Sequence, residues 1–229
     1  MSNILKIDIE TVPGGERLKL EDIVPDGRAK SEEKILESKK KKQKEEYESQ
    51  SLNPLKAQVL SFAAIVGDDA ENPKKYLHDS SELEVLRALE SVVLENFSYK
   101  EDGEIIIAPF VWCGFNIKAF DLQIISLRAI KYGLKYLAQS IPREPFDRKI
   151  LDLVDFYKGL DRYGKGYTQD KIAEFLGIET PEDLKGMDGS QVYSLYKEGR
   201  YEEILHYNVG DVVKVHEIFE KTNKVYDLI

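Results

Sequence analysis

The sequence predicts an α/β fold in which a central five-stranded mixed sheet is flanked by helices. Short apolar runs with strand composition come first, strand and helix patterns then alternate, and helical patterns alone follow residue 154. Apolar residues make up 42% of the 229 residues, which is enough for one full core. Because no repeat and no Pro- or Ser-rich linker divides the chain, we expect a single domain over residues 1–229.

The predicted strands are brief runs of aliphatic and β-branched residues bounded by Gly, Asp, Asn or Pro. The first run, ILKIDIET, stops before Pro13 and two glycines. The fourth is an almost unbroken apolar run, which is typical of a strand covered on both faces. The five strands are expected at residues 4–11, 58–66, 75–78, 105–115 and 148–154, with the first three in a meander.

Apolar residues at helical spacing predict the helices, and capping residues predict their ends. Ser80 or Ser81 is expected to cap the first helix, Asn116 to begin the second and Gly133 to end it. The helices are expected at residues 82–97, 117–132, 168–176, 190–198 and 202 to about 223.

A charged insertion at about residues 14–52 separates the first two strands. Pairs such as Lys41 and Glu45, four positions apart, favour a solvent-exposed helix, and a flexible arm is the alternative. The simplest interpretation is a solvated arm without chemistry. Because the insertion begins where the first strand ends, a second hypothesis is that the lysines of residues 39–44 contact a phosphate backbone.

Two acidic residues, Asp8 and Glu10, lie at the end of the first strand. Residues two apart in a strand point to the same face, so these carboxylates lie side by side. Such a pair is unfavourable unless a cation lies between them, which predicts a divalent metal ion. One cysteine, Cys113, and three histidines leave little material for a zinc site, so oxygen-ligated Mg²⁺ or Mn²⁺ is expected.

The formal net charge of −9 provides no bulk attraction to nucleic acid, but a metal-dependent nuclease can be acidic because its metals and local lysines contact the phosphates. The N-terminal residues MSNILK lack the features of a signal peptide, and the longest uncharged apolar run is shorter than the ~20 residues of a membrane span. We therefore expect a cytoplasmic protein with no membrane partner.

A D-x-E pair alone is a weak signal, and the chain contains a second one at residues 102–104, in a predicted turn. The order of three motifs strengthens the first pair. GFNIKAFD at residues 114–121 lies at a strand-to-helix junction, and YNVGD at residues 207–211 lies in the last long helix. These motifs resemble those of the DEDD (DnaQ-like) superfamily of 3′→5′ exonucleases, whose fold is ribonuclease H-like. Within it, the chain is similar to the tyrosine branch (DEDDy) and to the proofreading domain of family B DNA polymerases, but stand-alone.

The resemblance implies a site of four carboxylates and a phenol with two divalent metal ions, Mg²⁺ or Mn²⁺. Asp8 and Glu10 form the first motif. Asp121 is the second acidic ligand and Asp211 is the third, with Tyr207 beside it. The resemblance also implies that Thr11, Asn116 and Phe120 line the groove for the terminal nucleotides.

The chemistry of phosphodiester hydrolysis agrees with this set, because two metals ~3.5–4 Å apart activate water and stabilise charge on the leaving oxygen. We expect Asp8 to bridge the metals, and Glu10 and Asp211 to bind the nucleophile-side metal. Asp121 is expected to bind the other metal through water. Tyr207 is expected to orient the attacking water and to help Glu10 take its proton.

His206 is the alternative to Tyr207, because it stands five residues before Asp211, the spacing of the histidine branch. In a continuous helix, residues four apart share a face and residues five apart are turned away, which favours Tyr207. Asp152 and Asp155 are interpreted as structural or surface residues.

The sequence therefore predicts a metal-dependent 3′→5′ exonuclease that hydrolyses phosphodiester bonds from the 3′ end of single-stranded DNA, alone or with a replication or repair partner. A 3′→5′ exoribonuclease is one alternative, because the same metal chemistry serves RNA. A catalytically silent nucleic-acid-binding domain is another, and the intact acidic positions count against it.

Overall fold

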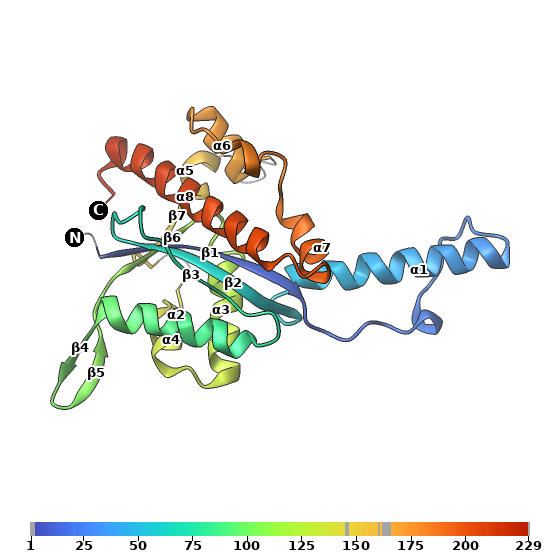
Figure 1. The fold of residues 1–229 in the computed structure, drawn as a ribbon, viewed down its shortest axis with the longest axis horizontal. Helices are drawn as coiled ribbons and strands as arrows, with labels where there is room; N and C mark the ends of the chain where they lie inside the picture. Colours follow the sequence, from blue (N-terminus) through green and yellow to red (C-terminus); the bar gives the residue numbers. More distant parts are fainter. Residues whose placement is uncertain (1–2, 145–146, 160, 162–165, 229) are drawn as a thin grey trace.

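The computed structural model describes residues 3–144, 147–159, 161 and 166–228. β1 (Ile4–Pro13) lies at the centre of a five-stranded sheet with the order β3-β2-β1-β6-β7 (Figure 1). β2 (Ala57–Val66) and β3 (Lys74–Leu77) continue from β1 as an antiparallel meander, whereas β6 (Val111–Gly114) and β7 (Ile150–Asp152) add parallel strands. The prediction of a mixed five-stranded α/β fold is confirmed.

Helices cover both faces of this sheet. α2 (Glu82–Phe97), α3 (Asp121–Tyr132) and α4 (Lys135–Ser140) lie on one face, and the long α8 (Tyr201–Tyr226) crosses the other (Figure 1). Side chains alternate between the two faces of β1, and those of Leu5, Ile7 and Ile9 pack in the core with residues of α2 and α3. The alternate residues of β1, which include Asp8 and Glu10, therefore face α8.

The predicted fourth strand is wrong as a single unit. Pro109, which has no N–H for a ladder, interrupts the apolar run. β5 (Glu104–Ile107) pairs with β4 (Ser98–Glu101) in a separate hairpin, and only β6 joins the main sheet. The second D-x-E pair lies at the turn of this hairpin, where Asp102 and Gly103 both have positive φ, as a tight two-residue turn requires.

The predicted start of the second helix is also wrong. Asn116 has a φ of 61°, whereas an N-cap residue has extended backbone, and a turn over residues 116–120 precedes the first helical residue, Asp121. Asp152 supports this turn, because its carboxylate accepts the N–H of Asn116 at 2.8 Å and that of Lys118 at 3.1 Å. The expected structural role of Asp152 is thus confirmed.

Two predicted helix-end residues, Ser81 and Gly133, agree with the structure. Ser81 caps α2 by accepting the N–H of Glu84 at 3.3 Å, and Gly133 ends α3 with a left-handed φ of 67°. α5 (Val154–Lys158), α6 (Gln169–Phe175), η3 (Glu182–Leu184), η4 (Gly189–Gln191) and α7 (Val192–Lys197) lead to α8. Within the described residues, no helix combines the length and the apolar character needed to cross a membrane.

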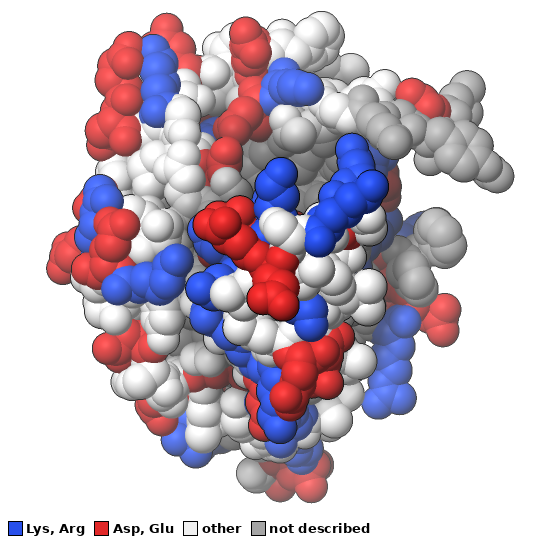
Figure 2. Space-filling view, turned by 90° about the vertical axis from the view of Figure 1, so that its right-hand side faces the viewer, with Lys and Arg blue, Asp and Glu red and all other residues white. Residues whose placement is uncertain are grey.

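The charged insertion contains η1 (Leu20–Asp22), α1 (Glu32–Glu48) and η2 (Ser49–Leu52), and α1 projects away from the sheet (Figure 1). Two of its lysines hold the loop before it: Lys39 donates to the carbonyl of Leu20 at 3.1 Å and Lys42 to that of Val24 at 3.0 Å. On the face that looks along α1, basic and acidic side chains interleave (Figure 2). The arm is therefore a helix of mixed charge.

Candidate metal centre

Carboxylates from both ends of the chain meet on the face of β1 that α8 covers. Oxygen atoms of Asp8, Glu10 and Asp211 all lie within 4.8 Å of one another. Asp8 and Glu10 come from β1, and Asp211 comes from the middle of α8. The donor set consists of carboxylate oxygens, which are the ligands that Mg²⁺ and Mn²⁺ prefer. The three residues therefore fit a divalent cation.

The neighbouring strand leaves room for these carboxylates. In β2, Ala63 pairs with Asp8 and Ser61 pairs with Glu10, and both partners have small side chains. The pairing register shifts between Glu10 and Thr11. Such irregularities re-aim the side chains that follow them, and here the shift comes directly after the acidic pair.

The crowding of these groups changes their protonation. Burial raises the pKa of Asp8 well above its usual range, and the charges of Asp211, Glu10 and Asp121 raise it further. Burial, followed by the charge of Asp211, does the same to the pKa of Glu10. Like charges in a desolvated setting favour either a bound proton or a bound cation. A divalent ion would relieve this repulsion.

Asp121 lies beside the group of three oxygens rather than in it. Its Oδ1 accepts the backbone N–H of Ile9, the residue between Asp8 and Glu10, at 3.1 Å. Burial raises the pKa of Asp121 to about 7, although the N–H groups of Ile9 and of Asp121 itself lower it. The structure thus brings Asp121 against β1 at the level of the acidic pair, as the first residue of α3.

α8 directs Tyr207 toward the carboxylates and His206 away from them. The phenol of Tyr207 is buried, and it lies close enough to Asp211 and Glu10 for their charges to act on it. His206 is exposed, and its Nε2 lies 2.7 Å from Oδ2 of Asp183. Burial raises the pKa of Tyr207, and the nearby carboxylates add to this effect. The phenol is therefore protonated at neutral pH and keeps a hydroxyl hydrogen to donate.

Asn208, which the sequence patterns did not identify, holds Asp8. Its Nδ2 donates to Oδ2 of Asp8 at 2.6 Å, while its Oδ1 accepts the hydroxyl of Ser61 at 3.0 Å. The residue is completely buried, and a buried amide needs partners for both ends. The available signal was an amide on the buried face of a helix, next to Tyr207.

Lys214 is a second functional neighbour that the sequence patterns missed. Its buried ammonium lies 2.9 Å from Oδ1 of Asp211 and 2.6 Å from Oδ1 of Asp170. Burial raises the pKa of Asp211, whereas the charge of Lys214 and its hydrogen bond lower it. The position of Lys214, one turn after Asp211 in α8, was the signal that could have found it.

The three residues expected to contact nucleotides lie in different settings. Thr11 is buried, and its hydroxyl donates to the carbonyl of Ser51 at 2.7 Å. Asn116 is exposed in the turn before α3, and Phe120 packs partly against the core. Their contact with substrate stays a prediction.

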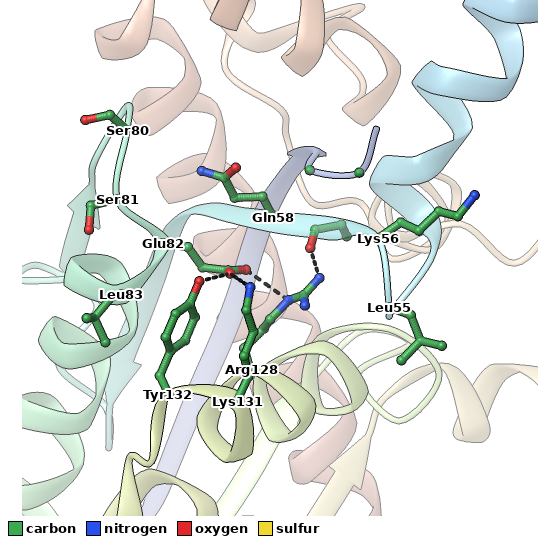
Figure 3. A pocket seen from close by; sticks show the side chains of 13 residues that line it. Leu55, Lys56, Gln58, Ser80, Ser81, Glu82, Leu83, Arg128, Lys131 and Tyr132 are labelled. Carbon is green, nitrogen blue, oxygen red and sulfur yellow. Dashed lines mark hydrogen bonds and ion pairs between the residues drawn. The ribbon is translucent and has the colours of Figure 1, made fainter. Parts of the chain in front are cut away.

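A separate cavity of about 410 Å³ lies between the start of α2 and the end of α3 (Figure 3). There, Tyr132, Lys131 and Arg128 converge on Glu82. The Tyr132 hydroxyl donates to Oε2 of Glu82 at 2.8 Å, and Nε of Arg128 lies 3.1 Å from Oε1. Arg128 also donates to the carbonyl of Ala57. This network satisfies a buried carboxylate and ties both helices to β2, so its role is structural.

Comparison with protein families matches residues 46–223 to the RNase H superfamily. The matched span begins after β1 and includes Asp121, Tyr207 and Asp211. No curated protein matches the chain. The superfamily match spans more than half of the chain, and the divalent metals that its nucleases use agree with the acidic group of Asp8, Glu10 and Asp211. The chain therefore belongs to the RNase H superfamily, which indicates a nuclease that acts on nucleic acid.

Proposed function

We propose that the protein is a metal-dependent 3′→5′ exonuclease of the tyrosine branch, which shortens single-stranded DNA from its 3′ end. One observation carries this proposal: oxygen atoms of Asp8, Glu10 and Asp211 all lie within 4.8 Å of one another, and the buried phenol of Tyr207 lies one helical turn before Asp211 in α8. Membership of the RNase H superfamily supports hydrolysis of nucleic acid. The tyrosine, four residues before Asp211 on the same helix, supports this branch.

The carboxylates have distinct roles in this proposal. Asp8, Glu10 and Asp211 would hold a divalent ion, and Asp8 and Asp121 would provide ligands for a second. When bound, the two ions lower the pKa of water and stabilise charge on the leaving oxygen. Asn208 and Lys214 keep Asp8 and Asp211 in place through the contacts described above. Both are positioning residues.

Tyr207 orients the attacking water and does not act as the base. Its phenol is protonated at neutral pH because burial raises its pKa, so it presents a fixed hydroxyl beside Asp211. Glu10 lies in the same acidic group and takes the proton of the water. This division separates positioning of the nucleophile from its deprotonation.

The test uses 5′-labelled single-stranded DNA, duplex DNA and RNA with Mg²⁺ or Mn²⁺. Wild type is expected to produce a stepwise ladder on single-stranded DNA, and Asp8→Asn is expected to abolish it. Asp102→Asn is the matched control, because it changes the other D-x-E pair, at the hairpin turn, and should retain full activity.

Other outcomes would change the assignment. Faster shortening of RNA would make the protein an exoribonuclease, and internal cuts would contradict exonuclease action. Binding without any shortening, in the presence of either metal, would leave a silent nucleic-acid-binding domain.

A further inference from the structure

A groove of about 550 Å³ opens between the base of the α1 arm and α7. Its walls include Lys44 and Glu48 of α1, Tyr193 and Lys197 of α7, and Thr11 of β1. Thr11 directly follows Glu10 in β1, so the strand that carries the acidic pair also contributes to a wall of the groove. The volume lies in the range of roughly 300–1,000 Å³ that is common for ligand sites.

The base of the arm is fixed at this point. Thr11 donates to the carbonyl of Ser51 in η2 at 2.7 Å, which joins the end of the insertion to β1. Tyr47 of α1 meets Tyr193 of α7 edge to face, with ring centroids 6.0 Å apart. Lys44, unlike Lys39 and Lys42 farther along the arm, therefore stands in the wall of a defined groove.

Two lysines of the groove share one glutamate as their ion-pair partner. Nζ of Lys44 and Nζ of Lys197 each lie 3.9 Å from Oε1 of Glu48. Exposed pairs at such distances contribute little to stability. A phosphate can therefore replace Glu48 as the partner of either lysine. With two lysines and one glutamate, this set is positive in a chain whose net charge is −9.

An aromatic ring accompanies these lysines. Nζ of Lys197 lies 4.6 Å from the centroid of Tyr193, whose side chain is partly exposed in the groove. Lysines that follow a backbone, combined with aromatic rings that contact bases, are the usual means by which proteins hold single strands without sequence preference.

We propose that this groove binds the single-stranded polynucleotide that leads away from the acidic group. Lys44 and Lys197 contact its phosphates, and Tyr193 contacts a base. The inference rests on the proposed function, because that function places the 3′ end of the same strand at Asp8 and Glu10. In this proposal the base of the α1 arm contacts the strand, and the projecting part of the arm does not.

Binding is measured by fluorescence anisotropy with labelled DNA and RNA strands of about 12 nucleotides, in an Asp8→Asn background that prevents shortening. Lys197→Gln is expected to weaken binding about fivefold and to reduce the slope of log Kd against log salt by about 0.7. Tyr193→Ala is expected to weaken it about tenfold or more, and Tyr193→Phe to restore most of the affinity. Glu48→Gln is expected to tighten it.

Lys100→Gln removes the same charge from β4, which lies at the far end of the molecule from α1 (Figure 1), and is expected to bind as the parent does. In the active protein, Lys197→Gln should lower kcat/KM for long strands more than for a dinucleotide.

The outcomes separate the two proposals. Wild-type cleavage with groove variants that bind and cleave like the parent would overturn the groove and leave the exonuclease. Groove-dependent binding without cleavage would overturn the exonuclease alone. Equal loss of affinity in Lys100→Gln and Lys197→Gln would show a general effect of charge and also overturn the groove.

Discussion

Asn208 in α8 donates its side-chain amide to the carboxylate of Asp8 in β1 at 2.6 Å, across 200 residues of sequence. The carbonyl of the same amide accepts the hydroxyl of Ser61 in β2 at 3.0 Å. One buried side chain thus joins two strands and the helix that crosses them. Because both ends of the amide are satisfied, the direction in which Asp8 faces the acidic group is set before any metal binds.

Asn208→Ala is expected to lower the free energy of unfolding by roughly 1–3 kcal/mol, since it leaves buried partners unsatisfied. It should also weaken Mn²⁺ binding, because Asp8 loses the bond that orients it. Chemical denaturation and calorimetric titration measure the two effects. Ser61→Ala is the control: it removes the second bond but keeps the contact with Asp8, so it should reduce stability and retain metal affinity. Unchanged metal affinity in Asn208→Ala would refute the positioning role.

Tyr207→Phe is expected to lower kcat by roughly 100-fold, because the proposed mechanism uses its hydroxyl to orient the attacking water. His206→Ala should leave kcat close to wild type, because His206 is exposed and pairs with Asp183. Single-turnover shortening of labelled DNA compares the two variants. A large loss in His206→Ala with little in Tyr207→Phe would reverse the assignment.

Lys214→Gln is expected to raise the pKa of Asp211, because the ammonium that opposes the effect of burial is removed. Protons then compete with metal at Asp211 up to a higher pH, so the acidic limb of the plot of kcat/KM against pH should move upward. Lys221→Gln, on the same helix, changes an exposed lysine that donates to the carbonyl of Leu176, and its profile should match wild type. Identical profiles for all three proteins would contradict this role.

The metal-free protein is expected to lose stability as the pH rises. The pKa values of Asp8, Glu10 and Asp121 are raised in the folded state, so each contributes stability that is fully present below its unfolded value of about 4. That stability is lost as the pH rises through the folded values, which for Asp121 is about 7. In chelator, Tm should therefore fall between about pH 5 and pH 8.

Divalent metal should reverse this loss. Mn²⁺ is expected to raise Tm more at about pH 8 than at about pH 5, because protons no longer occupy the carboxylates. Asp8→Asn should flatten the pH profile and reduce the response to metal, whereas Asp102→Asn should behave as wild type. A pH-independent Tm in chelator would contradict the electrostatic account of the site.

Much of the fold follows from local patterns. The D-x-E spacing at the end of an apolar strand placed two carboxylates on one face, and the spacing of Tyr207 and Asp211 placed both on one side of a helix. Gly133 and Ser81 marked helix ends through their own backbone and side-chain chemistry. Pro109 was the signal for the break in the predicted fourth strand, and the prediction did not use it.

Local patterns did not predict the other features, because each depends on a partner distant in sequence. The left-handed backbone of Asn116 is supported by Asp152, which lies on a different strand. Thr11 was expected to contact nucleotides, and it also anchors the insertion through Ser51.

The sequence by itself determined the strands, the helical faces and the chemical character of the site, because periodicity and residue type act over a few neighbouring positions. The tertiary structure decided which of those faces meet: that α8 crosses β1 so that Asn208 reaches Asp8, and that Lys214 neutralises Asp211. It also brought Lys44 and Tyr193 into one groove. These contacts form because the helices bury apolar surface against the whole sheet. That packing brings together residues that are far apart in the sequence, so local patterns cannot predict which of them meet.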